Sequence, residues 1–407
     1  MKLAKLQLIL ILINYTLIET RGRTMNKSKV YWCNFRMTNG ENLMKKMIRL
    51  AKAAGLDSID FEDKFTAIKM HFGEPGNLSY IRAQYARALV DYVKAKGGRP
   101  FLTDCNTMYP GMRKNALEHL DAAYLDGFDP LVTGCHIIIG DGLKGTDEAL
   151  VPFSEGEYVK EAKIGRAIMD ADVFISLTHF KLHEATGYGG AIKNIGMGCG
   201  SRAGKMEQHS AGKPLVNTNV CVGCGSCARA CGQNAITIKV PEGISNGKKK
   251  AVIDYDKCVG CGRCIGACPK DATYPGANNT NEILCRKMAE YAAAVVKGRP
   301  QFHISFIVDV SPFCDCYNFN DVPVIGDVGM FASTDAVALD EACAEMVQKQ
   351  PLLPGSLLAE QKHIHQGYEG SNDWSKDIHP TTVWEAQLEQ AEKVGMGTRK
   401  YELIEIK

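Results

Sequence analysis

Two short runs of cysteine constrain this chain more than any other feature of its sequence. Each run places four cysteines in eleven residues, with two residues between the first three cysteines and three before the fourth. The runs read CVGCGSCARAC and CVGCGRCIGAC. A spacing that occurs twice is much harder to obtain by chance than one that occurs once. The cysteines are Cys221, Cys224, Cys227 and Cys231, then Cys258, Cys261, Cys264 and Cys268.

This spacing predicts two [4Fe–4S] clusters of the bacterial ferredoxin type, in which the fourth cysteine of each run binds the other cluster. Zinc is the alternative, but zinc sites of this size usually have two C-x2-C pairs on either side of a longer loop. Glycines between the cysteines would let the backbone approach the sulfur atoms. The predicted ligands are Cys221, Cys224, Cys227 and Cys268 for one cluster, and Cys258, Cys261, Cys264 and Cys231 for the other.

Composition restricts the compartment and the partners. The formal net charge of +2 over 407 residues gives no electrostatic reason to expect nucleic acid or an anionic membrane as a partner. Eight of the sixteen cysteines belong to the two runs and the others are scattered. Oxygen-labile clusters and unpaired thiols favour a reducing compartment, so we expect a cytoplasmic protein.

The first 24 residues are expected to be a leader or a mis-assigned start. A basic beginning precedes a short apolar run over 8–13, which Asn14 interrupts. The run is too short to span a bilayer, and no A-x-A-like cleavage site follows it before Met25. We therefore expect the folded chain to begin near Met25, without stable membrane insertion.

The rest of the chain predicts an α/β domain with a mainly parallel sheet, interrupted by a ferredoxin module of α+β type. The predicted boundaries are 25–217 for the first part of the α/β domain, 218–275 for the module and 276–407 for the second part. Strands are expected over 65–70, 101–103, 136–139, 172–177 and 303–308. Helices are expected over 40–54, 80–96, 115–126, 158–169, 281–296, 335–347 and 382–394.

Polar residues follow several of the predicted strands, where open α/β sheets bind their ligands. Each has a simpler interpretation, because a histidine near a strand end is often a hydrogen-bonding loop residue. Cys314 and Cys316 are poorly spaced for a mutual disulfide, so metal ligation, redox chemistry and burial all remain open for them. Candidates for this second site are His71, Glu74, His183, Lys193, His209, Cys314 and Cys316.

Several motifs together resemble an uncharacterised bacterial and archaeal family that joins a domain of unknown function to a ferredoxin module. They are KMHFGEPGN, HEATGYGGAIKNIGMG, EQHS, the double cysteine run, CDC and ASTDAVALD. The resemblance covers nearly everything after Met25. It implies cluster binding and no settled reaction.

A more distant resemblance concerns the nickel-pincer lactate racemase. His183, Lys193 and His209 are spaced like three functional residues of that enzyme. The resemblance implies an acid/base role for His183, a cofactor or substrate anchor in Lys193 and a metal ligand in His209. The chain departs from the pattern at 104–107, where DCNT lacks the second catalytic histidine. A two-base racemisation is therefore not expected.

The leading hypothesis is an iron–sulfur redox protein whose clusters pass electrons to a metal or substrate site in the α/β domain. His71, His209, Cys314 and Cys316 are the candidate ligands of a further metal ion, and His183 and Lys193 the candidate catalytic residues. The electron donor or acceptor would be a partner protein or a small molecule. Two alternatives stay open: a racemase-like or isomerase-like enzyme with structural clusters, and an electron carrier or scaffold without catalysis.

Overall fold

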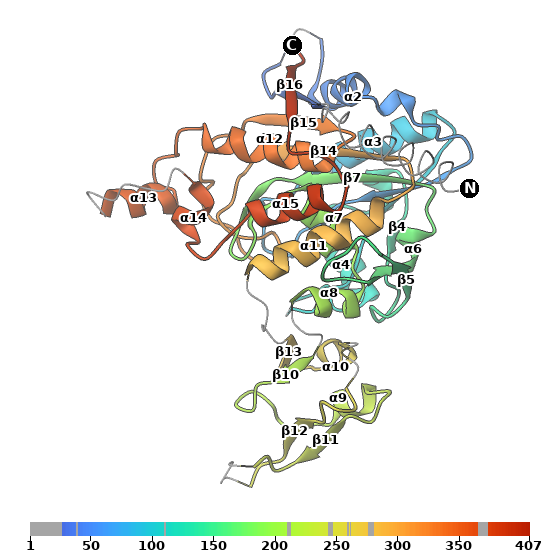
Figure 1. The fold of residues 1–407 in the computed structure, drawn as a ribbon, viewed down its shortest axis with the longest axis vertical. Coiled ribbons are helices and arrows are strands. Elements are labelled where there is room, and N and C mark those ends of the chain that lie inside the picture. Colours follow the sequence, from blue (N-terminus) through green and yellow to red (C-terminus); the bar gives the residue numbers. More distant parts are fainter. Residues whose placement is uncertain are drawn as a thin grey trace, which may run out of the picture.

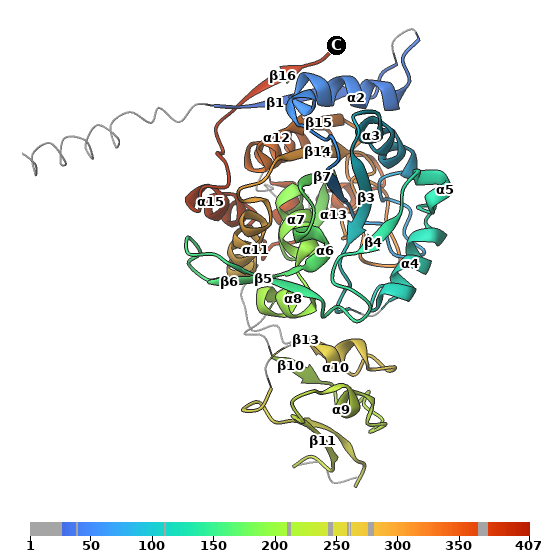
Figure 2. The same cartoon turned by 90° about the vertical axis from the view of Figure 1, so that its right-hand side faces the viewer.

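The structure is a computed structural model that describes residues 27–37, 40–109, 111–209, 213–242, 247–258, 260, 262–275, 281–364 and 373–407. It has a larger α/β body and a smaller lobe attached at one end (Figures 1 and 2). The expected leader over 1–24 lies outside the described residues. Among the helices that are described, none has both the length and the apolar character needed to cross a membrane.

An eight-stranded sheet forms the centre of the body. β15 runs antiparallel to its neighbours β1 and β14, and every other neighbouring pair is parallel. The predicted α/β fold with a mainly parallel sheet is therefore confirmed. In spatial order the strands are β16 (Tyr401–Glu405), β1 (Ser28–Asn34), β15 (Gly329–Ser333), β14 (Gln301–Ile307), β7 (Val173–His179), β2 (Phe65–Lys69), β3 (Arg99–Asp104) and β4 (Ile137–Ile139).

Helices cover both faces of the sheet, which is why its central strands are apolar on both sides. All seven residues of β7 are buried. On one face, α2 (Leu43–Ala53) and α3 (Ala83–Ala95) contribute to one hydrophobic core. The other core includes residues of α7 (Ala191–Cys199), α11 (Asn281–Val296), α12 (Ala336–Gln348) and α15 (Glu385–Lys393). Further helices of the body are η1 (Leu56–Ser58), α4 (Ala116–Leu125), α5 (Pro130–Thr133), α13 (Leu357–Ile364) and α14 (Trp374–Ile378).

The smaller lobe contains both cysteine runs. Its strands form two antiparallel pairs, β10 (Pro214–Val216) with β13 (Thr273–Pro275), and β11 (Ile236–Lys239) with β12 (Lys250–Ile253). One short helix follows the start of each cysteine run, α9 (Ser226–Ala230) and α10 (Arg263–Gly266). The helix α8 (Arg202–His209) lies in the body immediately before the lobe.

The prediction of a helix over 158–169 is wrong for most of that range. Residues Glu161–Gly165 form β6, which pairs antiparallel with β5 (Glu148–Pro152), and only α6 (Arg166–Met169) is helical. Ala162 and Ile164 are buried at the two-residue spacing of a strand. The pairing partner comes from an earlier segment, so it overrides the local helical preference.

Candidate functional site

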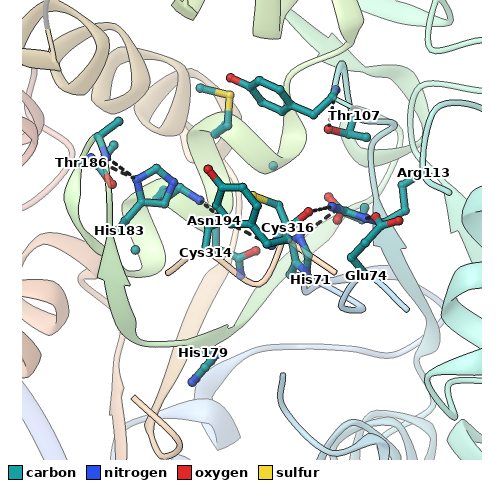
Figure 3. A pocket seen from close by; sticks show the side chains of 18 of the residues that line it. His71, Glu74, Thr107, Arg113, His179, His183, Thr186, Asn194, Cys314 and Cys316 are labelled. Atoms are coloured by element: carbon teal, nitrogen blue, oxygen red, sulfur yellow. Dashed lines mark hydrogen bonds and ion pairs between the residues drawn. The ribbon is translucent and has the colours of Figure 1, made fainter. Parts of the chain in front are cut away.

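A cavity of about 850 Å³ lies at the carboxyl ends of β2, β3 and β7, where ligands bind in open α/β sheets (Figure 3). Its size suits a small-molecule ligand. All seven residues that the sequence suggested for a second site line this cavity: His71, Glu74, His183, Lys193, His209, Cys314 and Cys316.

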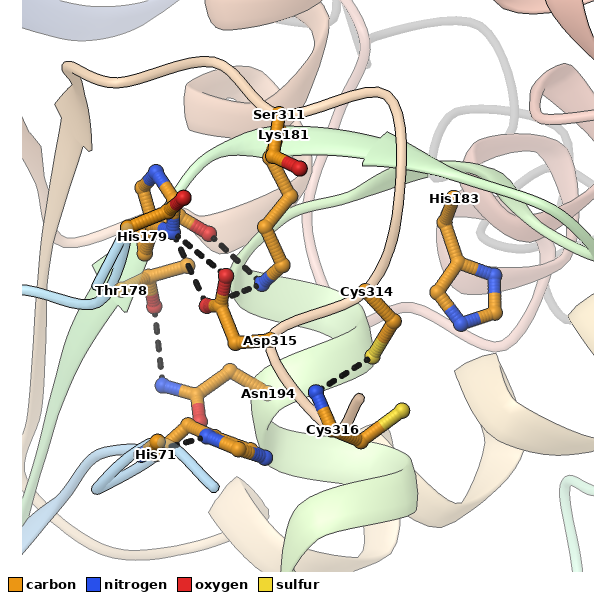
Figure 4. Close-up of polar contacts among 12 residues, drawn as sticks. His71, Thr178, His179, Lys181, His183, Asn194, Ser311, Cys314, Asp315 and Cys316 are labelled. Atoms are coloured by element: carbon orange, nitrogen blue, oxygen red, sulfur yellow. Dashed lines mark hydrogen bonds and ion pairs between the residues drawn. The ribbon is translucent and has the colours of Figure 1, made fainter. Parts of the chain in front are cut away.

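Two thiols stand at the wall of the cavity on the loop that follows β14. The Cys314 sulfur accepts the backbone N–H of Cys316 at 3.4 Å (Figure 4). It also accepts the Lys193 ammonium at 3.5 Å. A hydrogen bond from the Cys316 thiol holds the pKa of Cys314 well below its ordinary value. Burial acts in the opposite direction, whereas Lys193 and His183 lower this pKa further. The same shared hydrogen bond, together with burial, raises the pKa of Cys316. The pair therefore holds one proton between two sulfur atoms.

Lys193 is presented to the cavity by the first turn of α7. Asp340, from α12, caps this helix by accepting the N–H groups of Ala191 and Ile192 at 2.7 and 2.8 Å. Gly190 precedes the helix, and a side chain there would collide with the Asp340 carboxylate. Burial is the largest single influence and lowers the pKa of Lys193, but Cys314, Cys316 and Glu184 together outweigh burial and raise it. Lys193 is therefore a cation that balances a thiolate.

His183 ends β8 (Lys181–His183), which forms a hairpin with β9 (Gly187–Gly189). Its Nδ1 accepts two backbone N–H groups, from Ala185 and Thr186, each at 3.1 Å. The proton of the neutral ring therefore belongs on Nε2. In this arrangement His183 offers the cavity a hydrogen-bond donor, and a base at Nε2 would first require the loss of both backbone contacts.

His71 belongs to a buried polar group with Glu74 and Arg113. The Arg113 guanidinium donates to Glu74 at 2.6 Å and lies 2.9 Å from the Nε2 atom of His71. The N–H of Gly73 contacts the other ring nitrogen at 2.9 Å. Burial, followed by the charge of Arg113, lowers the pKa of His71 well below its ordinary value. His71 is therefore a neutral ring, and its one unprotonated nitrogen accepts from either Gly73 or Arg113.

His179 and Lys181 share the buried carboxylate of Asp315, the residue between the two thiols (Figure 4). One nitrogen of His179 lies 2.9 Å from Asp315 and the other 2.7 Å from the carbonyl of Val308. Both nitrogens face acceptors, so both must donate. Burial raises the pKa of Asp315, but His179 and Lys181 outweigh it and the pKa lies below its ordinary value. This ion-paired group anchors the loop that carries Cys314 and Cys316 to the end of β7.

His209 ends α8 on another side of the cavity. The Tyr109 hydroxyl lies 3.2 Å from the nearer ring nitrogen, and the two rings meet edge to face. Burial and the nearby His183 and Lys193 lower the pKa of His209 to about 3, so the ring is neutral.

The described residues do not supply a metal site in the cavity. Among them, no three His, Cys, Asp or Glu side chains come together in a way that could hold a metal ion. Each ring nitrogen of His71 lies 2.9 Å from a hydrogen-bond donor of the protein, and Cys314 is balanced by a lysine. The further metal ion suggested for His71, His209, Cys314 and Cys316 does not fit this geometry.

In the smaller lobe, a small cavity is lined by Cys221, Cys224, Cys227 and Cys268, the four residues predicted to share one cluster. Backbone N–H groups already point at sulfur in both runs: Ala251 at Cys221, Ala235 at Cys231 and Ala272 at Cys268, at 3.2–3.4 Å. Such contacts tune a bound cluster. Of the second predicted set, Cys231, Cys258 and Cys264 are described, and Cys261 lies outside the described residues.

The cysteine lobe and the large cavity share a boundary. Met108 lines the cavity and also packs in the apolar cluster that contains Cys221, Cys227, Cys264 and Cys268. On α8, Met206 belongs to the same cluster, whereas His209 faces the cavity. An ion pair of 2.5 Å between Lys114 and Asp271 also joins the body to the lobe.

Sequence reasoning missed several residues of the cavity. Lys69 pairs with Asp104 at 3.0 Å, although it ends an apolar strand, and a lysine in such a strand could have signalled a buried partner. Arg113 and Tyr109 lie in a loop whose sequence has no periodic pattern. Only the folded chain brings them to the cavity.

Comparison with known proteins adds a family and a distant structural likeness. No curated protein matches the chain. Among solved structures, the lactate racemase apoprotein from Thermoanaerobacterium thermosaccharolyticum is similar at 12% identity and a TM-score of 0.38. The match covers 69% of this chain and 51% of that one, so the chain spans about half the length of that structure. A likeness this distant implies neither a shared mechanism nor a shared cofactor. The family model described as "Domain of unknown function (DUF362)" matches residues 66–345, more than half of the chain, and the chain therefore belongs to the DUF362 family.

Proposed function

We propose that this protein is an iron–sulfur oxidoreductase in which two [4Fe–4S] clusters, held by the inserted cysteine lobe, exchange electrons with a small molecule in the cavity of the α/β body. The observation that carries the proposal is the position of Met108, which borders both the cavity and the apolar cluster of the cysteines. Because the cysteine lobe lies directly against a ligand-sized cavity, clusters bound in the lobe would be close enough to exchange electrons with a ligand in the cavity.

The cysteine lobe suits this role. Cys221, Cys224, Cys227 and Cys268 line one cavity, as the motif requires for a single cluster. When bound, the clusters would supply one-electron chemistry. Cys231, Cys258 and Cys264, with Cys261, would hold the second cluster.

The lobe also offers a place for electrons to enter from a partner protein or a small donor. Cys224 is exposed at the surface, and the neighbouring Val222 is exposed for 62% of its surface. A partner that docks at this apolar edge would meet a cluster ligand directly. The other side of the lobe faces Met108 and the cavity, so electrons would cross the lobe from surface to site.

Iron and sulfide analysis with EPR spectroscopy tests the proposal on protein purified without oxygen. We expect about eight iron atoms and a similar amount of sulfide per chain, and EPR signals that appear on reduction with a low-potential donor. Cys227→Ala should lose iron, whereas Cys285→Ala, in the buried face of α11, should keep it.

Two results would overturn the proposal. Zinc without sulfide would remove the clusters. Clusters that are intact but take up no electrons would favour the isomerase-like alternative, in which the clusters are structural.

A further inference from the structure

The thiol pair in the cavity is set apart from the other buried cysteines of the body. Cys314 is 2% exposed and its sulfur accepts hydrogen bonds from a backbone N–H and from an ammonium group. Burial instead raises the pKa of Cys199 to about 11 and that of Cys343 well above its ordinary value, which keeps both thiols protonated. A thiolate, not a thiol, is the nucleophile in thiol chemistry. Cys314 is therefore equipped to react, and Cys199 and Cys343 are not.

The position of Cys316 indicates which reaction the Cys314 thiolate is suited to carry out. Its thiol lies within hydrogen-bond reach of the Cys314 sulfur, and it is less buried than Cys314. A nucleophile that only adds to a carbonyl group needs no second thiol. A nucleophile that attacks a disulfide does need one, because the mixed disulfide must be resolved.

We infer that Cys314 and Cys316 are a redox-active dithiol that reduces a small-molecule disulfide in the cavity, and that the two clusters restore the dithiol after each turnover. The inference rests on the proposed function, because the clusters are its source of electrons. A small molecule is required because Cys314 is buried at the wall of a cavity of about 850 Å³, where the disulfide of a folded protein could not reach it.

The reaction balances in atoms and electrons. The Cys314 thiolate attacks one sulfur of the substrate RSSR, which forms the mixed disulfide Cys314–S–S–R and releases RS⁻. Cys316 gives its proton to that RS⁻ and attacks the Cys314 sulfur, which releases the second RS⁻ and leaves a Cys314–Cys316 disulfide. Two electrons, one from each cluster, and one proton then restore the thiolate and the thiol. The sum is RSSR + 2e⁻ + H⁺ giving RSH and RS⁻.

The short spacing of the two cysteines, which counts against a stable structural disulfide, suits a transient one. A disulfide across a single residue is strained, and strained disulfides are the more oxidising, labile ones. Lys193 favours the reduced state, because its ammonium balances the thiolate that reduction produces. His183 adds a hydrogen bond to the same sulfur.

Electron counting tests the inference on the full-length protein without oxygen. The protein is oxidised with the thiol oxidant diamide, separated from it and titrated with reduced methyl viologen; reduction of hydroxyethyl disulfide is assayed separately. We expect about four electrons per chain, two for the clusters and two for the disulfide. Cys314→Ala should take up about two electrons and lose the reduction of hydroxyethyl disulfide. Cys343→Ala, a buried cysteine outside the cavity, is the matched control and should take up about four.

The iron content of the same samples separates the two proposals. Full iron with about two electrons in the unmodified protein would overturn the dithiol and leave the proposed function standing. Full iron and four electrons without reduction of hydroxyethyl disulfide would overturn the substrate class. Protein without iron would overturn the proposed function itself.

Discussion

The Lys193 ammonium lies 3.5 Å from the Cys314 sulfur. The two residues are 121 positions apart in the sequence and come from α7 and from the loop after β14. Their pairing joins a helix that packs on one face of the sheet to a loop at its carboxyl edge. After the larger effect of the hydrogen bond from Cys316, it also lowers the pKa of the thiol, because an opposite charge nearby favours the ionised form.

Removing the ammonium should shift the reactivity of Cys314 to higher pH. In Lys193→Met the pKa of Cys314 rises, so the rate of alkylation by iodoacetamide should reach its plateau at a higher pH than in the unmodified protein. Lys193→Arg keeps the charge and should shift the plateau less. The measurement is the alkylation rate of the peptide containing Cys314, followed by mass spectrometry from pH 5 to 9. An unchanged pH profile in Lys193→Met would show that the lysine does not lower the pKa of Cys314.

Glu74→Ala should destabilise the fold strongly, because it leaves the Arg113 guanidinium buried without its carboxylate. Both side chains are 4% exposed, and breaking a buried pair from one side costs about 3–5 kcal/mol. Asp91→Ala breaks an exposed pair with Arg87 and should cost less than about 1 kcal/mol. Urea denaturation measures both. An equal loss of unfolding free energy in the two variants would contradict the larger contribution of the buried pair.

Asp340 should make stability fall as the pH rises. Burial raises its pKa to about 7, although the N–H groups of Ile192 and Ala191 act in the opposite direction. Since this value lies above that of an unfolded aspartate, the folded state holds the extra proton between about pH 4 and pH 7. The stability contributed by Asp340 is therefore full below about pH 4 and is lost as the pH rises through 7. Asp340→Asn should flatten this part of the curve of unfolding free energy against pH, and a curve unchanged by the substitution would contradict the assignment.

Gly196→Ala should loosen the contact between α7 and α11. A methyl group at Gly196 would collide with the backbone carbonyl of Met288, which cannot move aside without shifting α11. Overpacking of this kind costs about 1–3 kcal/mol. Gly326→Ala, where no atom lies within contact distance, is the matched control. Thermal unfolding should distinguish them, and a stable Gly196→Ala variant would show that the two helices are less closely packed.

The parts of the fold with strong local patterns could be predicted from the sequence. The helix over 281–296 has the predicted limits, and the helix expected over 80–96 is observed as Ala83–Ala95. The elements that depend on distant partners could not be predicted from the sequence. β15 was missed because its five residues become a strand through pairing with β1 and β14, and β6 was mistaken for a helix.

In the site, too, some features could be predicted from the sequence and others depend on distant partners. Residues at the ends of predicted strands, such as His71 and Cys314, could be expected to meet because parallel strands share a carboxyl edge. Their protonation and partners could not be expected, since these depend on Arg113 and on the backbone around Ala185. The motif ASTDAVALD also has a structural explanation: Asp335 caps its own helix α12, and Asp340 caps α7.

Rapid-freeze EPR spectroscopy tests the passage of electrons from lobe to cavity most directly. Oxidised full-length protein would be mixed with about two electron equivalents of reduced methyl viologen and frozen at increasing times. We predict that the signal of the reduced clusters rises and then decays as the electrons reach the Cys314–Cys316 disulfide, whereas in Cys314→Ala the signal persists. A signal that persists equally in both proteins would contradict the account.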